Sequence, residues 1–174
     1  MKLKFLMSAM FIASVGFVSA ANAAGGTLTF TGLVTADSCT VDTGSLNQTV
    51  TMTDSYKNSF SAVGDTDGDT PFNIKLTNCP QSVTSVKLNA SATMIDNTNP
   101  QLVKLDASSA AAGVGIAIYD DAGTLVPMAS ETKAYPVAGD GTATINMVAK
   151  LMSTSTTVTT GDYTGTAGFT VIYN

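Results

Sequence analysis

The sequence predicts an all-β fold, an antiparallel sandwich of about seven to nine short strands. Two features of the chain predict it. Thr, Val and Ile dominate segments in which apolar residues recur at every second position, and Gly, Asn, Asp and Pro fall between these segments as turn residues. No internal repeat or domain linker interrupts this pattern along the 174 residues, so one β domain is predicted.

The alternating segments give the expected strands in chain order. Leu28, Phe30, Gly32 and Val34 form the first alternating set. Later strands are expected at residues 50–52, 72–79, 83–88, 114–119, 142–152 and 169–173. A hairpin turn is expected at residues 119–123, with residues 124–128 as its return arm. Residues 107–112 are compatible with one helical turn, which is too short to change the fold class.

Residues 1–23 have the features of a signal peptide. Lys2 and Lys4 precede an uncharged apolar run over residues 5–18, and Ala21-Asn22-Ala23 has the small-x-small pattern of a signal peptidase site. A retained membrane anchor is the alternative, but the run is shorter than the ~20 residues that a helix needs to span a bilayer. We therefore expect cleavage after Ala23 and export of the chain.

Without residues 1–23 the chain is acidic and contains no arginine. Six lysines then face thirteen carboxylates, which gives a formal charge of −7. Nucleic-acid binders need cationic side chains to displace phosphate counterions. Bidentate recognition of phosphate ligands needs the arginine guanidinium. The composition therefore argues against both functions.

Cys39 and Cys79 are the two cysteines of the chain. Because export delivers the protein to an oxidising compartment, a disulfide between them is expected. Two buried free thiols are the alternative. A bridge that closes about 40 residues would stabilise the fold by ~4 kcal/mol in the chain-entropy model.

The chain contains no histidine. This excludes Ser-His-Asp and Cys-His nucleophiles, together with metal sites that depend on imidazole. Paired carboxylates can act as general acid and base, but most acidic residues here lie in turn-like surroundings such as Asp120-Asp121. No catalytic residue and no cofactor is therefore predicted, and an enzymatic function needs two close carboxylates in a cleft.

Asp65, Asp67 and Asp69, beside Gly68, resemble the start of a calcium loop, because carboxylates at alternate positions supply oxygen ligands. A full loop of this kind needs a bidentate Glu further along, but the chain continues through Thr70-Pro71 into a strand. We interpret the segment as a solvated acidic loop, so no metal site is predicted.

The first alternating segment differs from the others. Most apolar residues of the alternating segments are expected in the core, but Leu28, Phe30 and Val34 lie only a few residues from the new N-terminus, where chains are usually frayed and polar. Left exposed, such a strand would be an aggregation site. It must therefore pair within the domain or with another chain, to which it can offer backbone hydrogen bonds and alternate side chains.

These residues, taken in order, resemble the pilin subunits of chaperone–usher fimbriae, in the group of the major subunits of type 1-like pili. The resemblance spans the chain after the leader. It rests on Thr27 to Val34 ahead of Cys39, on Phe72 to Cys79, on Val114 to Asp120 with its turn, on Gly161 and on the penultimate Tyr173.

The resemblance implies an incomplete immunoglobulin-like sandwich that lacks its last strand and has a hydrophobic groove beside its C-terminal strand. The expected organisation is a signal peptide (1–23), an N-terminal donor-strand extension (24–36) and a pilin domain (37–174). Leu28, Phe30, Gly32 and Val34 would fill the groove of the next subunit, with Gly32 at a shallow pocket where a Cβ clashes.

The same resemblance assigns the acceptor side and the partners. Gly161, Phe169, Val171 and Tyr173 would border the groove, and the Asn174 carboxylate would anchor a basic chaperone site. The disulfide between Cys39 and Cys79 would join the first two strands of the domain. The implied partners are neighbouring subunits of a homopolymer, a periplasmic chaperone and an outer-membrane usher, and the implied destination is a fimbria on the cell surface.

The favoured hypothesis is therefore a non-enzymatic structural subunit of a fimbria that supports cell adhesion and polymerises by donor-strand exchange. Only 15 residues precede Cys39 after the leader, which leaves a minor or adaptor pilin as an alternative. A second alternative is a self-contained secreted β-sandwich that binds carbohydrate or a host surface.

Overall fold

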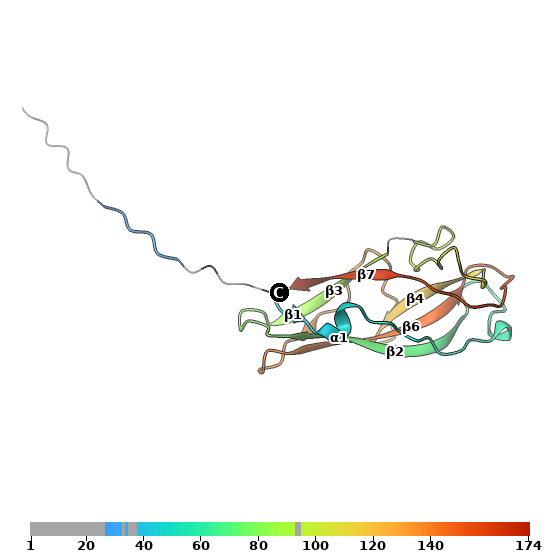
Figure 1. The fold of residues 1–174 in the computed structure, drawn as a ribbon, viewed down its shortest axis with the longest axis horizontal. Coiled ribbons are helices and arrows are strands. Elements are labelled where there is room, and N and C mark those ends of the chain that lie inside the picture. Colours follow the sequence, from blue (N-terminus) through green and yellow to red (C-terminus); the bar gives the residue numbers. More distant parts are fainter. Residues whose placement is uncertain (1–26, 33, 35–37, 93–94) are drawn as a thin grey trace, which may run out of the picture. The chain divides into compact units, whose positions relative to one another are not determined.

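The computed structural model describes residues 27–32, 34, 38–92 and 95–174, and residues 35–174 form one compact unit. That unit, the domain, is built mainly from β-strands in two sheets (Figure 1). The strands are β1 (Thr40–Val41), β2 (Thr66–Thr77), β3 (Ser85–Ala92), β4 (Val114–Asp120), β5 (Tyr135–Pro136), β6 (Ala143–Ser153) and β7 (Ala167–Tyr173). Two short helices, α1 (Thr43–Leu46) and the 3-10 turn η1 (Lys57–Ser59), lie between β1 and β2.

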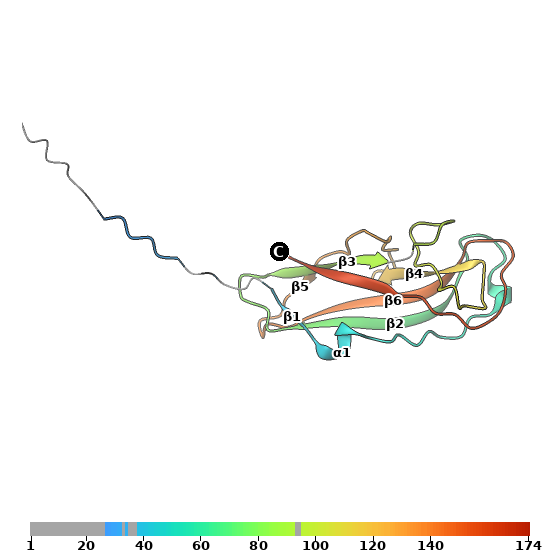
Figure 2. The ribbon, with the colours of Figure 1, turned by 45° about the horizontal axis from the view of Figure 1, so that its top comes forward.

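The two sheets are antiparallel throughout their described pairings. One has the strand order β1-β2-β6-β4 and the other the order β5-β3-β7. The sheets lie face to face, with β3 and β7 over β6 and β2 (Figure 2). The predicted antiparallel β-sandwich is therefore confirmed.

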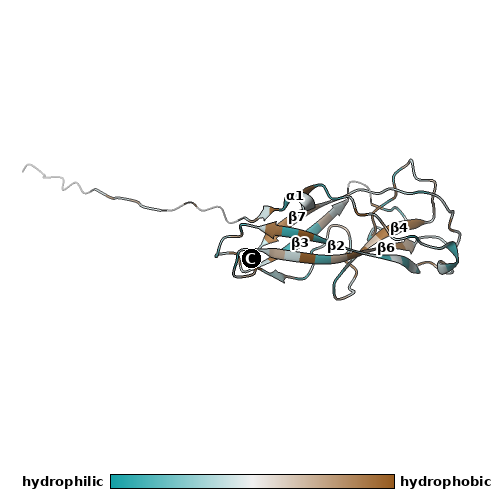
Figure 3. Ribbon diagram, turned by 60° about the horizontal axis from the view of Figure 1, so that its bottom comes forward, coloured by the Kyte–Doolittle hydropathy of each residue, from teal (hydrophilic) through white to brown (hydrophobic). Residues whose placement is uncertain are grey.

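The core lies between the sheets and follows the period-two alternation of the sequence. On β6, five alternate apolar side chains are buried: Ala143, Ile145, Met147, Ala149 and Leu151. Ile74 and Leu76 of β2 and Leu88 of β3, in the other sheet, belong to one buried cluster with Ala143, Ile145 and Met147. The hydropathy colouring shows this alternation on the strands (Figure 3). A strand with one buried face needs this pattern, because successive side chains point to opposite faces.

The domain has two ends that matter for its function. At the disulfide end, the Cys39–Cys79 bridge joins residues next to β1 and β2, and the N–H of Cys79 donates to the Gly141 oxygen over 2.9 Å. At the opposite end, the Phe60 end, a second apolar cluster surrounds the buried side chain of Phe60. Strand β7 runs from the Phe60 end to the disulfide end, where the Tyr173 hydroxyl donates to the Cys39 oxygen over 3.4 Å.

Several predicted elements differ from the structure. Residues 50–52 form no strand, residues 107–112 form no helical turn, and no named strand follows the turn after β4. The N–H of Val126 still donates to the Ile118 oxygen, so a remnant of the return arm exists. The short strands β1 and β5 were not predicted, because two residues are too few to show a period.

The predicted leader, residues 1–23, lies outside the described residues. Among the residues that are described, no helix is both long enough and apolar enough to cross a membrane.

Candidate functional site

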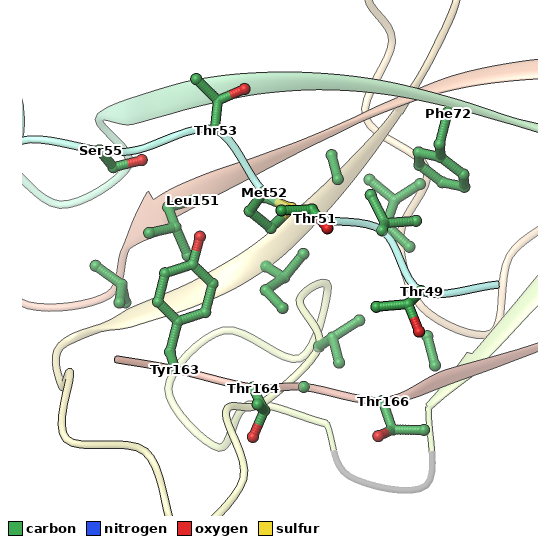
Figure 4. A pocket seen from close by; sticks show the side chains of 18 of the residues that line it. Thr49, Thr51, Met52, Thr53, Ser55, Phe72, Leu151, Tyr163, Thr164 and Thr166 are labelled. Atoms are coloured by element: carbon green, nitrogen blue, oxygen red, sulfur yellow. The ribbon is translucent and has the colours of Figure 1, made fainter. Parts of the chain in front are cut away.

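The main concave feature of the described domain is a groove with a volume of about 1200 Å³. One long wall is residues 45–57, which connect α1 to η1, and the other is residues 158–169, which lead into β7. The floor between them comes from β2, β3, β4 and β6 (Figure 4). The groove is therefore an opening in the sandwich itself, where the apolar interior reaches the surface.

The first wall is an extended segment without a strand partner. Residues 48–52 make no hydrogen bond to the rest of the described chain. The segment is held only near its ends. The Ser45 hydroxyl accepts from the N–H of Lys75 over 3.0 Å, and the N–H of Thr53 donates to the Thr70 hydroxyl over 2.8 Å. Backbone donors and acceptors therefore remain unused along the middle of this wall.

The second wall ends in β7, an edge strand. β7 pairs with β3 on one side, from Ala167↔Ala92 to Tyr173↔Val86, and it is the last strand of its sheet. Its other edge faces the groove and carries backbone groups without a strand partner in the described chain. An unpaired edge of this kind is a template for a further strand.

The floor is apolar and the rims are polar. Ile74, Ala90, Met147 and Leu151 are buried residues that line the groove, and Phe72 is half-buried beside them. Val50 and Met52 of the first wall are also half-buried, whereas their neighbours are exposed threonines (Figure 4). A segment that offers an apolar residue at every second position would match this arrangement.

Tyr163 lines the groove near its Phe60 end. Its ring reaches from the second wall toward Leu151 (Figure 4). Tyr163 packs against the Phe60 cluster. Burial raises the pKa of the Tyr163 phenol, and the nearby Asp54 carboxylate raises it further. Across the groove, the buried hydroxyl oxygen of Ser55 has no hydrogen-bond partner.

Gly161 stands at the same end and lies against the segment before β4. A Cβ at this position would come within 2.5 Å of the Ala110 Cβ, and the backbone φ is +155°. The neighbouring Asp162 oxygen accepts from the N–H groups of Ala110 and Ala111 over 2.8 and 3.2 Å. Glycine is therefore needed here to bring the second wall close to its neighbour.

At the disulfide end, β7 is tied to the start of β3. The main-chain oxygen of Asn174 accepts from the N–H of Thr84 over 2.8 Å, from the Thr84 hydroxyl over 3.2 Å and from the N–H of Ser85 over 3.1 Å. The N–H of Asn174 donates back to the Ser85 oxygen over 3.0 Å. These bonds fix the last residues of the wall.

The predicted acidic loop is part of an ordered structure instead. The Asp65 carboxylate accepts from the N–H groups of Ser61 and Ala62, that of Asp67 accepts from the N–H of Tyr56, and that of Asp69 pairs with Lys150 at 2.9 Å. Each carboxylate has its own partner, and strand β2 already begins at Thr66. Among the described residues, no cluster of three or more His, Cys, Asp or Glu side chains could hold a metal ion.

The fimbrial protein family model matches residues 28–174. The chain belongs to this family. It is 35% identical over 99% of its length to long polar fimbria protein A of Salmonella typhimurium, 96% of which is covered. A solved type I fimbria protein of Burkholderia pseudomallei is 37% identical to this chain and matches its structure with a TM-score of 0.61. The match covers 78% of this chain and 88% of the Burkholderia chain.

The structure of the P pilus rod subunit PapA matches this chain with a TM-score of 0.64 at 21% identity. The match covers 78% of this chain and 99% of the PapA chain, and it supports the assignment of the fold. Together with the relatives, these matches identify the chain as a structural subunit of a fimbria, which assembles with other subunits at the cell surface.

In this fimbrial subunit the predicted acceptor residues separate into two groups. Gly161 and Phe169 line the groove. Val171 and Tyr173 lie further along β7, half-buried against the main core, and Asn174 is held at the end of the strand. The disulfide between Cys39 and Cys79 is present and joins the flanks of β1 and β2, as predicted.

The predicted donor segment forms no strand in its described part, residues 27–32 and 34. The side chains of Leu28, Phe30 and Val34 are 82%, 89% and 99% exposed. A Cβ added at Gly32 would meet no atom within 4 Å. The described part of this segment therefore does not bury these apolar side chains by its own folding.

Sequence reasoning missed the first wall and Tyr163. The alternation of Val50 and Met52 between threonines was a usable signal, but it was interpreted as a paired strand. Tyr163 has no alternating neighbours, and its position became evident only from the packing of Phe60, Val158 and Leu151.

Proposed function

We propose that this fimbrial subunit polymerises by donor-strand exchange. Residues 24–36 act as a donor-strand extension, and the groove of the domain, residues 37–174, receives the extension of a neighbouring copy. The observation that carries the proposal is a groove with an apolar floor and two long walls that both leave backbone groups unpaired. A single added strand would use both edges at once.

The length and pattern of the extension support the fit. Residues 28–34 in extended form span about 20 Å, and Thr49 to Ser55 of the first wall have the same number of residues. Leu28, Phe30 and Val34 would face the floor. Full burial of such side chains contributes about 1.5–3 kcal/mol each relative to exposure, so their transfer from water into the groove favours assembly.

The direction of the donor strand follows from its two neighbours. Residues 48–55 run from the disulfide end toward the Phe60 end, and β7 runs in the opposite direction. A strand between them must be parallel to one and antiparallel to the other. Because β7 is the regular strand and antiparallel pairing is slightly more stable, the donor runs antiparallel to β7 and its C-terminal residues reach the Phe60 end.

Before assembly, the open groove would expose apolar surface and two strand edges, which is an aggregation hazard. A periplasmic chaperone that covers the groove would remove this hazard. At an outer-membrane usher, the extension of the next subunit would then replace the chaperone. We propose both as partners, with transit through the periplasm and a structural rather than catalytic role in a homopolymer. The backbone of Asn174 is bonded to Thr84 and Ser85, so a basic chaperone site would contact this already ordered terminus.

Deletion of residues 24–35 tests the proposal. We expect loss of surface fibres, with the variant retained as a soluble, chaperone-bound monomer. A matched pair sharpens the result. Phe30→Ser removes a side chain that would face the floor, whereas Thr29→Ser alters its neighbour on the opposite face. The first should reduce fibre yield strongly and the second should not. Fibres that still form after the deletion would contradict the proposal.

A further inference from the structure

We propose that the loop of residues 56–65 forms an end-to-end contact with the disulfide end of the copy that donates its strand. This inference rests on the proposed donor-strand exchange. Only residues 35–37 separate Val34 from Ser38, which precedes Cys39. Four residues of extended chain span at most about 14 Å. The disulfide end of the donating copy must therefore lie within that distance of the place where its Val34 sits in the groove.

That place is the Phe60 end of the receiving domain. A donor antiparallel to β7 has Leu28 nearer the disulfide end and Val34 nearer Tyr163, which lines the groove near the Phe60 end. The donor chain therefore leaves the groove beside the loop that turns from the first wall into β2. This loop is residues 56–65 and includes η1.

The loop presents apolar side chains to solvent. Tyr56 is 67% exposed and Val63 is 59% exposed, although both are large apolar residues. Exposed apolar residues are individually ordinary on a soluble protein. Here the two residues lie on one loop at the end of the groove. The short connection between Val34 and Cys39 requires the domain of the donating copy to approach this loop.

Hydrogen bonds within the domain already hold the loop before any contact forms. The buried Ser153 hydroxyl donates to the Ala62 oxygen over 2.6 Å, and the N–H of Ser153 donates to the Asp65 oxygen over 2.9 Å. The Asp67 carboxylate accepts from the N–H of Tyr56 over 2.9 Å. A surface that is already ordered loses little conformational entropy on binding, which favours association.

The facing surface on the donating copy consists of two turns at the disulfide end. In the first, the N–H of Val83 donates to the Pro80 oxygen over 3.0 Å, and in the second, the N–H of Gly141 donates to the Ala138 oxygen over 2.9 Å. The bond from Cys79 to the Gly141 oxygen joins the turns. Gln81 is exposed at the tip of the first turn. Residues 35–38 join the donor segment to Cys39, which lies at the same end of the domain as these turns. When the donor segment is docked, the turns therefore lie close to the 56–65 loop of the receiving copy.

Cysteine cross-linking in assembled fibres tests the contact. Fibres of the full chain carrying Val63→Cys and Gln81→Cys should give a covalent ladder on non-reducing electrophoresis after mild oxidation. The control carries Val63→Cys and Ala122→Cys, because Ala122 is exposed in the turn after β4. We expect at least tenfold less ladder from the control. Equal ladders from both pairs, or none from the first, would overturn the inference.

A second variant tests whether the contact stabilises the fibre. Val63→Ser leaves the donor segment, both walls and the floor of the groove intact, because Val63 does not line the groove, so fibres should form in normal yield but dissociate several-fold faster in urea. An unchanged rate counts against the inference alone. If instead the variant that lacks residues 24–35 still assembled into fibres, the proposed donor-strand exchange itself would have failed. The two failures are therefore distinguishable.

Discussion

The Ser153 hydroxyl donates to the main-chain oxygen of Ala62 over 2.6 Å and so ties the end of β6 to the loop that follows the groove wall. Ser153 is 1% exposed and lies 91 residues from Ala62 in the sequence. A buried hydroxyl is acceptable at this position because the loop oxygens of Ala62 and Asp65 accept from it over 2.6 and 3.3 Å. Hydrogen bonds to the end of β6 therefore hold the loop at the Phe60 end against the folded domain.

Ser153→Ala should destabilise the domain by about 1 kcal/mol, because it removes the hydrogen bond from the buried Ser153 hydroxyl to the Ala62 oxygen. Urea unfolding followed by circular dichroism measures the change. Thr156→Ala, at an exposed position in the following loop, is the control and should change stability by less than about 0.5 kcal/mol. Equal effects of the two substitutions would show that the hydroxyl has no structural role.

Gly161→Ala should also destabilise the domain, by about 1–3 kcal/mol, because the added Cβ would overlap the Ala110 side chain. The second wall would move, so fibre yield should fall together with the urea midpoint. Gly139→Ala is the matched control, since a Cβ there meets no atom within 4 Å. A Gly161→Ala variant as stable as the control would contradict the assigned close approach.

Gly32→Asn should block assembly without affecting the domain. Gly32 lies outside the compact unit of residues 35–174, so we expect the substitution to act when the segment docks in a neighbouring groove. We expect normal stability and normal chaperone binding but loss of fibres. Thr31→Asn, which alters the opposite face of the segment, should retain them. Fibres from the Gly32→Asn variant would show that no shallow pocket receives this residue.

The fold was largely predictable from the sequence because strands with one buried face must alternate. The alternation within residues 142–152 predicted a strand, and the alternate residues Ala143, Ile145 and Met147 are all buried on it. The disulfide was predictable from export and from the presence of two cysteines. Both inferences use local patterns or simple chemistry, which a single sequence contains.

The groove was not predictable from local pattern in the same way. Val50 and Met52 alternate with polar residues like the residues of any strand, but their segment has no hydrogen-bonded partner strand in the described chain. The local sequence pattern is the same whether or not a partner strand is present. The role of Gly161 depends on Ala110, 51 residues away, and that of Tyr163 on packing against the Phe60 cluster. Only tertiary contacts reveal such positions, and so only the resemblance to pilins anticipated the acceptor side.

Loss of the disulfide should lower the free energy of unfolding by ~4 kcal/mol, the chain-entropy value for the 40-residue separation of Cys39 and Cys79. The doubly substituted Cys39→Ala, Cys79→Ala variant and the reduced unmodified chain should have similar urea midpoints. Adding reductant to the double variant is the control and should change nothing. A reduced chain that is as stable as the oxidised one would contradict the expected contribution.

The Asp67 carboxylate should make the stability of the domain depend on pH in the acid range. Its pKa lies below the ordinary value of 3.8, because the N–H of Tyr56 and then the Ser59 side chain donate to the ionised form. The unfolded chain therefore binds the proton more tightly than the folded chain. The ionised Asp67 carboxylate therefore stabilises the folded state. This stabilisation is fully present above about pH 4 and is lost as the pH falls through the lower pKa of the folded state.

Asp67→Asn should consequently be less stable than the unmodified chain at pH 7, and the difference should vanish near pH 2, where a protonated Asp resembles Asn. Urea midpoints at the two pH values measure this. Asp54→Asn, at an exposed carboxylate that accepts no hydrogen bond in the described chain, should show little difference at either pH. Because Asp67 holds the backbone of Tyr56, the same substitution should loosen the 56–65 loop and raise the rate of fibre dissociation in urea at pH 7. A difference between Asp67→Asn and the unmodified chain that persists unchanged at pH 2 would mean that the carboxylate charge does not hold this loop.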